Sequence, residues 1–444
     1  MKREKKTMSK IKKPFLWSAI AMLFMIMACS DNEDPATEQT DNPTGGMPQL
    51  QWEKTFDGPY GEHIKVILEK PGGGYLAVGE VMSAFPNGKA ANFHGSIDIY
   101  LMDLDPQGNI LWERCYGGSG TETLGDIQKT DDGGYIMIVN LDLPAGVSST
   151  DGDIAIECQN NFHSVGWVVK IAPSGDIQWQ KCLHSYAIYS SILQGPDGGY
   201  LTVSSRNYNA LLTKLNQNGG IVWEREYGGA GIDVITTVIN TSDGGYLAGG
   251  NSKSTDGDFS ENHGSDIWVF KTNASGAIQW QKLYGSTSGV QNLYDIKETP
   301  QGNFVFTGDT NSPLGTTGDI TEYFSGSDIW AVQIDPTGTL LWQKSLGGAS
   351  YEWANALEVT QNGDILLAGT TNSWNNHITE HFGSTDIWVI SLSSEGQLKW
   401  QKSLGGAYAD ESYSIVQSAQ GGIIVAGMKG ESLQDVDMYI AKLQ

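Results

Sequence analysis

The sequence predicts an all-β chain folded as a seven-bladed β-propeller, with four antiparallel strands in each blade. Three markers support this prediction, because each of them recurs seven times through residues 49–444. The first is a tryptophan in the pattern Gly-x-Ile-x-Trp, the second is an Asp-Gly-Gly-Tyr hairpin signal, and the third is an alternating strand such as Asp-Ile-Trp-Val. Repeats of about 40 to 65 residues with four short strands each are typical of propeller blades.

The three markers keep step with one another along the chain. The tryptophans are Trp52, Trp112, Trp179, Trp223, Trp280, Trp342 and Trp400. The hairpin signals, some of them degenerate, occupy residues 72–75, 132–135, 197–200, 243–246, 301–304, 362–365 and 420–423. The alternating strands begin near Asp98, Val165, Asn209, Asp266, Asp328, Asp386 and Asp437.

One unit illustrates the four strands, which we call A to D. Strand A covers residues 233–241, strand B residues 245–250, strand C residues 266–272 and strand D residues 277–285. Each segment alternates apolar with polar residues and is bounded by Gly or Asp turns, which is the signature of short strands.

The two ends of the repeat region are out of phase. The chain enters it on a lone strand D, residues 49–56, and leaves it on a lone strand C, residues 437–443. Pairing these two strands completes a seventh blade and leaves no open sheet edge. The sequence therefore predicts a closed ring rather than an open solenoid.

The stretch Leu-Asp-Pro-Gln-Gly-Asn-Ile-Leu-Trp at residues 104–112 resembles the tryptophan-docking motif of quinoprotein-type propellers. The whole repeat is similar to the β-propeller repeats of Bacteroidota surface lipoproteins. It departs from the sialidase Asp-box, where the glycine and the aromatic residue are closer together. The adjacent cysteines and the basic cofactor site of quinoprotein dehydrogenases have no counterpart, so the resemblance implies a fold and no particular activity.

The first 28 residues resemble a lipoprotein signal peptide. Seven basic residues are followed by an apolar stretch, residues 15–28, that is shorter than the roughly 20 residues needed to span a bilayer. The segment Ile26-Met27-Ala28-Cys29 resembles a lipobox, which implies that Cys29 carries the lipid, including palmitate. The alternative is an ordinary secretory signal in which the cysteine is a coincidence.

The acidic residues 30–34 resemble the signal that exports Bacteroidota lipoproteins to the cell surface. We therefore expect an outer-membrane, surface-exposed protein held through its lipid. A plain solvated linker would have a similar composition. Residues 29–48 are rich in Asp, Thr, Asn and Pro and predict a disordered tether.

The net charge of the chain limits the classes of partner that we expect. Without residues 1–28 the chain loses seven of its 27 Lys and Arg and one of its 51 Asp and Glu, which leaves a net charge of −30. So acidic a protein is not expected to bind nucleic acid or to adsorb on anionic lipid, and neutral partners such as glycans are favoured. We expect a monomer, with Cys158 and Cys182 as a possible disulfide and Cys115 free.

Loop lengths orient the ring. The A–B and C–D turns are tight, whereas B–C loops are long, as at residues 80–97, 141–164 and 309–327. Strand D starts from the face of tight turns, so the tether is expected to enter there. The opposite face, which we call the long-loop face, should point away from the membrane and carry function.

Two tryptophans, Trp353 and Trp374, break the repeat in the sixth blade, and both are expected to reach the long-loop face. Polar residues suited to binding a sugar surround them: Glu352, Asn372, Asn375, Asn376 and His377. The alternative is that the two indoles only attach loops to the core.

An acidic residue recurs ten positions before the hairpin signal, with Gln291 and Ala187 as exceptions. The set comprises Glu62, Glu122, Asp233, Glu352 and Asp410. Because strand A is innermost in propellers, we expect these carboxylates at a mouth of the central channel. They could bind a cation or serve a hydrolase or lyase; the alternative is that they accept backbone N–H groups where the strand begins.

The B–C loops carry oxygen-rich spacings that could hold Ca²⁺, although none is an EF-hand loop. They are Asp151 with Asp153, Asp256 with Asp258, and Asp319, with Glu261 or Glu322 following. No other cofactor is indicated. His94, His163, His263 and His381 recur before strand C and are interpreted as loop anchors rather than metal ligands.

No Gly-x-Ser-x-Gly, His-Glu-x-x-His, P-loop or Cys-x-x-Cys pattern occurs in the sequence. The sequence thus favours a surface lipoprotein that binds a glycan or a protein through its long-loop face. The alternatives are a carbohydrate-active hydrolase or lyase and a scaffold subunit of an outer-membrane complex.

Overall fold

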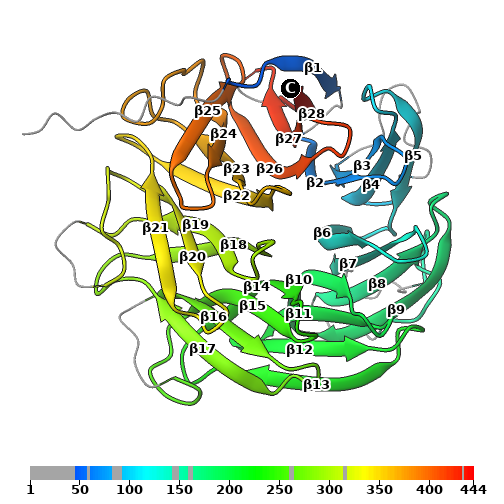
Figure 1. Cartoon of the computed structure of the whole chain (residues 1–444). Helices are drawn as coiled ribbons and strands as arrows, with labels where there is room; N and C mark the ends of the chain where they lie inside the picture. Colours follow the sequence, from blue (N-terminus) through cyan, green and yellow to red (C-terminus); the bar gives the residue numbers. More distant parts are fainter. Residues whose placement is uncertain are drawn as a thin grey trace, which may run out of the picture. The chain divides into compact units, whose positions relative to one another are not determined.

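The computed structural model describes residues 46–57, 61–82, 93–142, 150–158, 164–259, 265–313, 318–432 and 435–444. Cys29, His163, Glu261, His263, the signal segment and nearly all of the predicted tether lie outside them. In the described residues the chain forms 28 strands, grouped into seven four-stranded antiparallel sheets that surround a central axis (Figure 1). The predicted seven-bladed β-propeller is confirmed.

We number the blades in chain order and give their strands from the innermost, A, to the outermost, D. Blade 1 holds β2 (His63–Glu69), β3 (Tyr75–Val81), β4 (Asp98–Leu104) and β5 (Ile110–Tyr116); blade 2 holds β6 (Thr121–Lys129), β7 (Tyr135–Asp142), β8 (Val165–Ile171) and β9 (Ile177–Ser185). Blade 3 holds β10 (Ala187–Gln194), β11 (Tyr200–Arg206), β12 (Asn209–Leu215) and β13 (Ile221–Tyr227); blade 4 holds β14 (Asp233–Asn240), β15 (Tyr246–Ser252), β16 (Asp266–Thr272) and β17 (Ile278–Tyr284). Blade 5 holds β18 (Gln291–Glu298), β19 (Phe304–Thr310), β20 (Asp328–Ile334) and β21 (Leu340–Leu346); blade 6 holds β22 (Glu352–Val359), β23 (Ile365–Thr371), β24 (Asp386–Leu392) and β25 (Leu398–Leu404). Blade 7 holds β26 (Asp410–Gln417), β27 (Ile423–Gly430), β28 (Val436–Leu443) and β1 (Leu50–Phe56).

The ring closes in blade 7. Strand β1 pairs antiparallel with β28, from Leu50 opposite Leu443 to Phe56 opposite Met438. Two further backbone hydrogen bonds of 2.8 Å join Gln49 and Gln444. The first strand of the fold is therefore the outer strand of the last blade, as the phase of the repeat predicted.

The recurring tryptophans are structural. Those of strand C (Trp167, Trp268, Trp330 and Trp388) are fully buried, and each donates its indole N–H to a glutamine of strand D. Those of strand D, with the exception of Trp400, pack against the glycine of the C–D turn in the next blade. At Gly175, whose φ is +83°, an added Cβ would come within 3.0 Å of the Trp112 ring. The spacing of Gly and Trp in each repeat thus encodes blade-to-blade packing.

No helix long and apolar enough to cross a membrane occurs in the residues that the structure describes.

Candidate functional site

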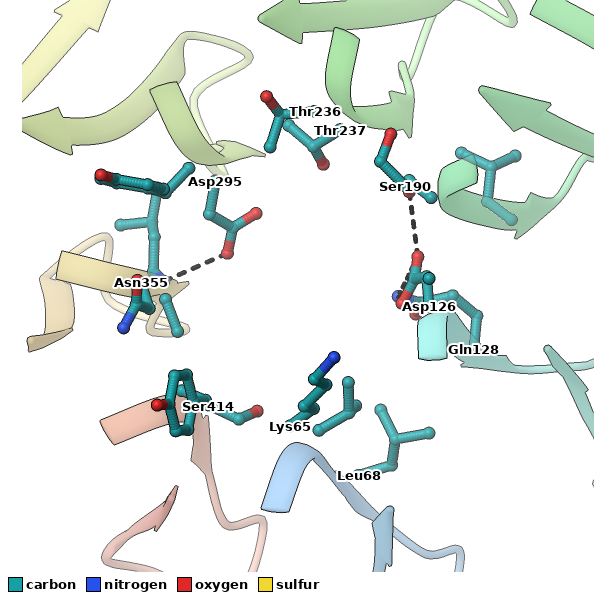
Figure 2. Close-up of a pocket in the computed structure, with 18 of the residues that line it drawn as sticks. Lys65, Leu68, Asp126, Gln128, Ser190, Thr236, Thr237, Asp295, Asn355 and Ser414 are labelled. Carbon is teal, nitrogen blue, oxygen red and sulfur yellow. Dashed lines mark hydrogen bonds between the residues drawn. The ribbon is translucent and has the colours of Figure 1, made fainter. Parts of the chain in front are cut away.

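The seven innermost strands line a central channel with a volume of about 880 Å³ (Figure 2). Each of these strands has a register irregularity near its third residue, as between Leu124 and Asp126 in β6. A bulge directs additional side chains to one face of a strand. Asp126 and Asp295 face the cavity from opposite sides in Figure 2.

Asp126 joins two blades inside the channel. Its Oδ2 accepts hydrogen bonds from the Ile192 backbone N–H at 3.1 Å and from the Ser191 hydroxyl at 2.9 Å, both on the innermost strand of blade 3. Burial raises the pKa of Asp126 to about 6, although these hydrogen bonds favour the charged form. The Asp126 carboxyl group therefore has a structural role, because it joins blade 2 to blade 3.

Asp295 has the same role between blades 5 and 6. Its Oδ2 accepts the Leu357 backbone N–H at 3.1 Å, and both of its oxygens lie within 3.0 Å of Lys297 Nζ. Burial opposes the charge of Lys297, but Asp295 and Glu358 raise its pKa. Glu358 lies beside this pair in the channel, and burial raises its pKa to about 7. Sequence reasoning missed this cluster because its members occur in single blades.

The predicted channel-mouth carboxylates lie elsewhere. Glu62, Glu122, Asp233, Glu352 and Asp410 are fully buried, and none is among the residues that line the channel. Four of them accept the backbone N–H located four residues earlier, at distances from 2.6 to 3.1 Å: Glu122 from Gly118, Asp233 from Gly229, Glu352 from Gly348 and Asp410 from Gly406. The D–A loop folds back over the strand entry and covers them, so the alternative reading describes their geometry better.

The acidic pairs of the B–C loops bind the backbone of the D–A loop that leads into the same blade. Asp151 Oδ2 accepts the Ser119 N–H at 2.9 Å, and Asp256 Oδ1 accepts the Ala230 N–H at 2.7 Å. Two residues later, the Asp153 and Asp258 N–H groups donate to the carbonyls of Gly117 and Gly228. In the described residues no group of three or more His, Cys, Asp or Glu side chains is placed to hold a metal ion.

The polar residues near Trp374 are the blade-6 version of the same loop. Asn375 Oδ1 accepts the Ala349 N–H at 2.8 Å, and the His377 N–H donates to the Gly347 carbonyl. Asn376 has a φ of +56°, close to the +58° of Gly152 and the +67° of Gly257. Aligning Asn-Asn-His with the two Asp-Gly-Asp segments would have revealed this correspondence in the sequence.

Trp374 and Trp353 have different settings. Trp374 is 71% exposed on the loop after β23, and its ring centre lies 6.4 Å from that of His381. Trp353 is half-buried within β22, the innermost strand of blade 6. Only Trp374 stands open to solvent.

Three further exposed aromatic side chains lie on the loops around Trp374. Phe324 is 37% exposed and touches His377 edge-on, with ring centres 4.8 Å apart. Tyr351 is 56% exposed, and its backbone exchanges hydrogen bonds with Asn372. Phe382 is 51% exposed on the same B–C loop as Trp374. We call Phe324, Tyr351, Trp374 and Phe382 the aromatic platform.

The structure also shows the contacts of two of the predicted loop-anchoring histidines and the pairing of the cysteines. His94 Nδ1 lies 3.4 Å from Asp98, and His381 Nδ1 lies 2.8 Å from Asp386, so both histidines anchor the loop that precedes strand C. Cys158 and Cys182 form a disulfide, with Cα atoms 5.5 Å apart, and Cys115 is buried and free.

No family model and no curated protein matches the sequence. Among solved structures, a catalytically inactive virginiamycin B lyase from Staphylococcus aureus, determined with quinupristin, is 12% identical with a TM-score of 0.52 over 88% of this chain and 99% of that one. A protein of unknown function from Dyadobacter fermentans is 12% identical with a TM-score of 0.48 over 90% and 100%. A gluconolactonase from Xanthomonas campestris is 11% identical with a TM-score of 0.36 over 64% and 82%. At such identities the likeness concerns the fold alone: the chain is a β-propeller.

Proposed function

We propose that the protein is a non-enzymatic surface lipoprotein that binds a glycan through the aromatic platform on its long-loop face. The observation that carries the proposal is the Trp374 indole, which is 71% exposed although its loop is firmly tied down. Burying so large an apolar surface is favourable, and an exposed indole without a ligand forgoes that gain.

The loop that carries Trp374 is preorganised. Asn372, Ser373 and Asn375 accept the backbone N–H groups of Tyr351, Ser350 and Ala349, each at 2.8 Å. The binding of a ligand that stacks on this indole would therefore lose little conformational entropy in the loop. The net charge of −30 for the chain without residues 1–28 supports a neutral ligand rather than an anionic one.

A glycan array probed with the purified protein tests this proposal. Trp374→Ala should reduce the affinity of any hit at least tenfold, while Leu111→Ala should not change it. Leu111 is the matched control because it is 61% exposed on β5, an outer strand far from the loops of blade 6 in the sequence. Hits that are equally strong in both variants, or no hit at all, would count against the glycan.

A second candidate is a hydrolase or lyase in the channel, and Glu358 is the observation that favours it. A carboxyl group with a pKa near 7 inside a cavity of about 880 Å³ suits general acid–base chemistry. Activity toward array hits that disappears in Glu358→Gln but persists in Trp374→Ala would select this candidate. Co-purification with a fixed set of outer-membrane proteins from intact cells would instead indicate a scaffold subunit.

The surface location is part of the proposal and rests on the lipobox-like segment and the acidic residues 30–34. Metabolic labelling with a palmitate analogue should mark the wild-type protein, and Cys29→Ser should abolish the label and release the protein from membranes. External protease should degrade the wild-type protein on intact cells. A labelled protein that is resistant to protease would place it on the inner leaflet.

A further inference from the structure

A pair of polar side chains recurs at most of the junctions between one blade and the next. One member lies at the start of strand C, and the other lies at the start of strand A in the following blade. Four junctions hold two acids. In three of them, Asp98 with Glu122, Asp328 with Glu352, and Asp386 with Asp410, all six side chains are fully buried. The fourth junction, between blades 7 and 1, holds Asp437 and Glu62.

A glycine at the end of strand D permits the two acids to approach each other. Asp328 Oδ1 and Glu352 Oε2 both lie within 2.8 Å of the point that a Cβ on Gly347 would occupy. The same holds for Asp98 Oδ1 and Glu122 Oε2 at Gly117. Any side chain at these glycines would fill the space between the carboxyl groups.

The hydrogen bonds of the Asp328–Glu352 pair distinguish its two members. Both oxygens of Glu352 accept a hydrogen bond: Oε2 receives the Gly348 N–H and Oε1 receives the Thr371 hydroxyl, each at 2.8 Å. Asp328 Oδ2 receives the Phe324 N–H at 2.7 Å, whereas Asp328 Oδ1 has no hydrogen-bond partner within the described residues. The buried oxygen that lacks a partner is the one facing Glu352.

The third pair repeats this asymmetry. Asp410 accepts the Gly406 N–H at one oxygen and the Gly430 N–H at the other. Asp386 Oδ1 has no partner among the residues described, although its Oδ2 receives the Phe382 N–H. In these two pairs the oxygen without a partner belongs to the residue of strand C.

Other junctions replace one or both of the acids. At two junctions an amide lies opposite an acid: Asn209 Oδ1 and Asp233 Oδ2 adjoin Gly228, and Gln291 Oε1 and Asp266 Oδ1 adjoin Gly285. Between blades 2 and 3 the same positions hold Val165 and Ala187, so both polar groups are absent. The ring therefore accepts an uncharged group at either position, and a protonated carboxyl group is uncharged.

We propose that Asp328 and Glu352 share one proton, which Asp328 Oδ1 donates to the Glu352 carboxylate, and that this carboxylic acid–carboxylate contact joins blade 5 to blade 6. The pairs Asp98–Glu122 and Asp386–Asp410 join their blades in the same way. The ring is thereby sensitive to pH, since loss of the proton leaves two like charges buried side by side.

The electrostatic surroundings of the acids agree with this geometry. Burial, together with the charge of Glu352, raises the pKa of Asp328 to about 7, and burial raises the pKa of Glu122 to about 8. The other charged or titratable groups around Asp328–Glu352 are Tyr323, Tyr351, His377, Glu322 and Lys344, and no basic side chain in the described residues forms an ion pair with either acid. His94 adjoins Asp98 and His381 adjoins Asp386, so the pair in blades 5 and 6 is the cleanest one to test.

The sign of the effect follows from the raised pKa. The folded state holds the shared proton more tightly than the unfolded chain does, so the contact stabilises fully below the ordinary pKa of aspartic acid and is lost as pH rises through about 7. For one such pair the unfolding equilibrium constant should rise roughly 100-fold between about pH 5 and about pH 9.

Chemical unfolding of the full chain from about pH 5 to about pH 9 tests the proposal. Asp328→Asn places an amide N–H where the proton would be, so this variant should lose the roughly 100-fold dependence contributed by one pair. The matched control is Asp335→Asn in the C–D turn of the same blade, where Asn216 and Asn273 occupy the corresponding position in other repeats. This control should keep the wild-type pH dependence.

Infrared spectroscopy supplies a readout of the proton itself. At about pH 6 the wild-type protein should show a protonated-carboxyl band that weakens in Asp328→Asn and not in Asp335→Asn. If Asp328→Asn does not fold, Asp386→Asn serves the same purpose for blades 6 and 7. Equal pH dependence in the two blade-5 variants, or a chelator that lowers the stability of the wild type but not of Asp328→Asn, would overturn the shared proton and, in the second case, indicate a bound cation.

Discussion

Asn140 and Tyr189 join blades 2 and 3 through two hydrogen bonds. The Asn140 side-chain amide donates to the Tyr189 carbonyl at 2.9 Å, and its Oδ1 accepts the Tyr189 backbone N–H at 2.8 Å. Asn251 reaches the backbone of β18 in blade 5 in the same manner. The junction between blades 2 and 3 has no acid pair at its strand entries, and the hydrogen bonds of Asn140 and Asp126 join these blades.

Asn140→Ala should therefore lower the free energy of unfolding by about 2 kcal/mol, because two backbone groups of β10 lose their partners. Denaturant unfolding measures the loss. Asn109→Ala is a suitable control, since Asn109 lies in an exposed turn and should change stability by less than about 0.5 kcal/mol. Equal losses in the two variants would show that the junction does not depend on this amide.

Tyr284→Phe should cost about 1 kcal/mol, the usual net value of one buried hydrogen bond. The Tyr284 hydroxyl donates at 2.6 Å to the Gly338 carbonyl in the C–D turn of the next blade, and Tyr227 reaches Gly276 in the same way. Leu346 and Leu404 end the corresponding strands of blades 5 and 6, so the position tolerates the loss of a hydroxyl. A thermal melt that is unchanged relative to the wild type would contradict the expectation.

Asp243→Asn should weaken the protein at neutral pH and not at about pH 2. The hydrogen bond from the buried Lys271 ammonium lowers the pKa of Asp243 to about 2. Its contribution is therefore present above the ordinary pKa of aspartic acid and is lost as pH falls through about 2. Since the carboxylate is largely exposed, screening limits the effect to about 1 kcal/mol. Unfolding curves measured along an acid series, with Asp131→Asn in the A–B turn of blade 2 as the control, give the comparison.

Reduction of the Cys158–Cys182 disulfide should lower the free energy of unfolding by about 3 kcal/mol, because the bridge closes a loop with a sequence separation of 24. Cys182→Ser should show the same loss and no further response to reductant. Burial raises the pKa of Cys115 to about 12, so its peptide should remain unmodified when the native protein is treated with an alkylating agent. Rapid alkylation of Cys115 would mean that blade 1 opens locally.

The fold was predictable because its determinants recur. The contact between Trp112 and Gly175 recurs from blade to blade, so its residues recur in the sequence. The closure of the ring is visible in the sequence because the repeat starts and ends out of phase. The roles of loop residues were harder to predict, because different residue types can make the same structural contact at equivalent positions. Asn375 performs in blade 6 what Asp151 performs in blade 2, so its departure from the repeat looked functional in the sequence.

The sequence predicted where the channel lies but not which side chains line it. The carboxylates expected at its mouth are buried beneath the D–A loops. The way in which these loops fold back over the strands could not be predicted from the repeat pattern. Asp126, Asp295 and Glu358 line the channel instead, and a one-residue bulge in each inner strand decides which side chains face inward. A bulge shifts the alternation by one residue, so the period of the strand alone misassigns these positions.

The pairing of Leu50 with Leu443 also determines when the molecule can be completed during its synthesis. The ribosome makes β1 first, and this strand has no partner until β28, the last strand of the chain, has emerged. Until then blade 7 is incomplete, and an unpaired strand at each end of the nascent chain is a site for aggregation. A chaperone that holds the emerging N-terminal strand would act at the point where this chain is most vulnerable.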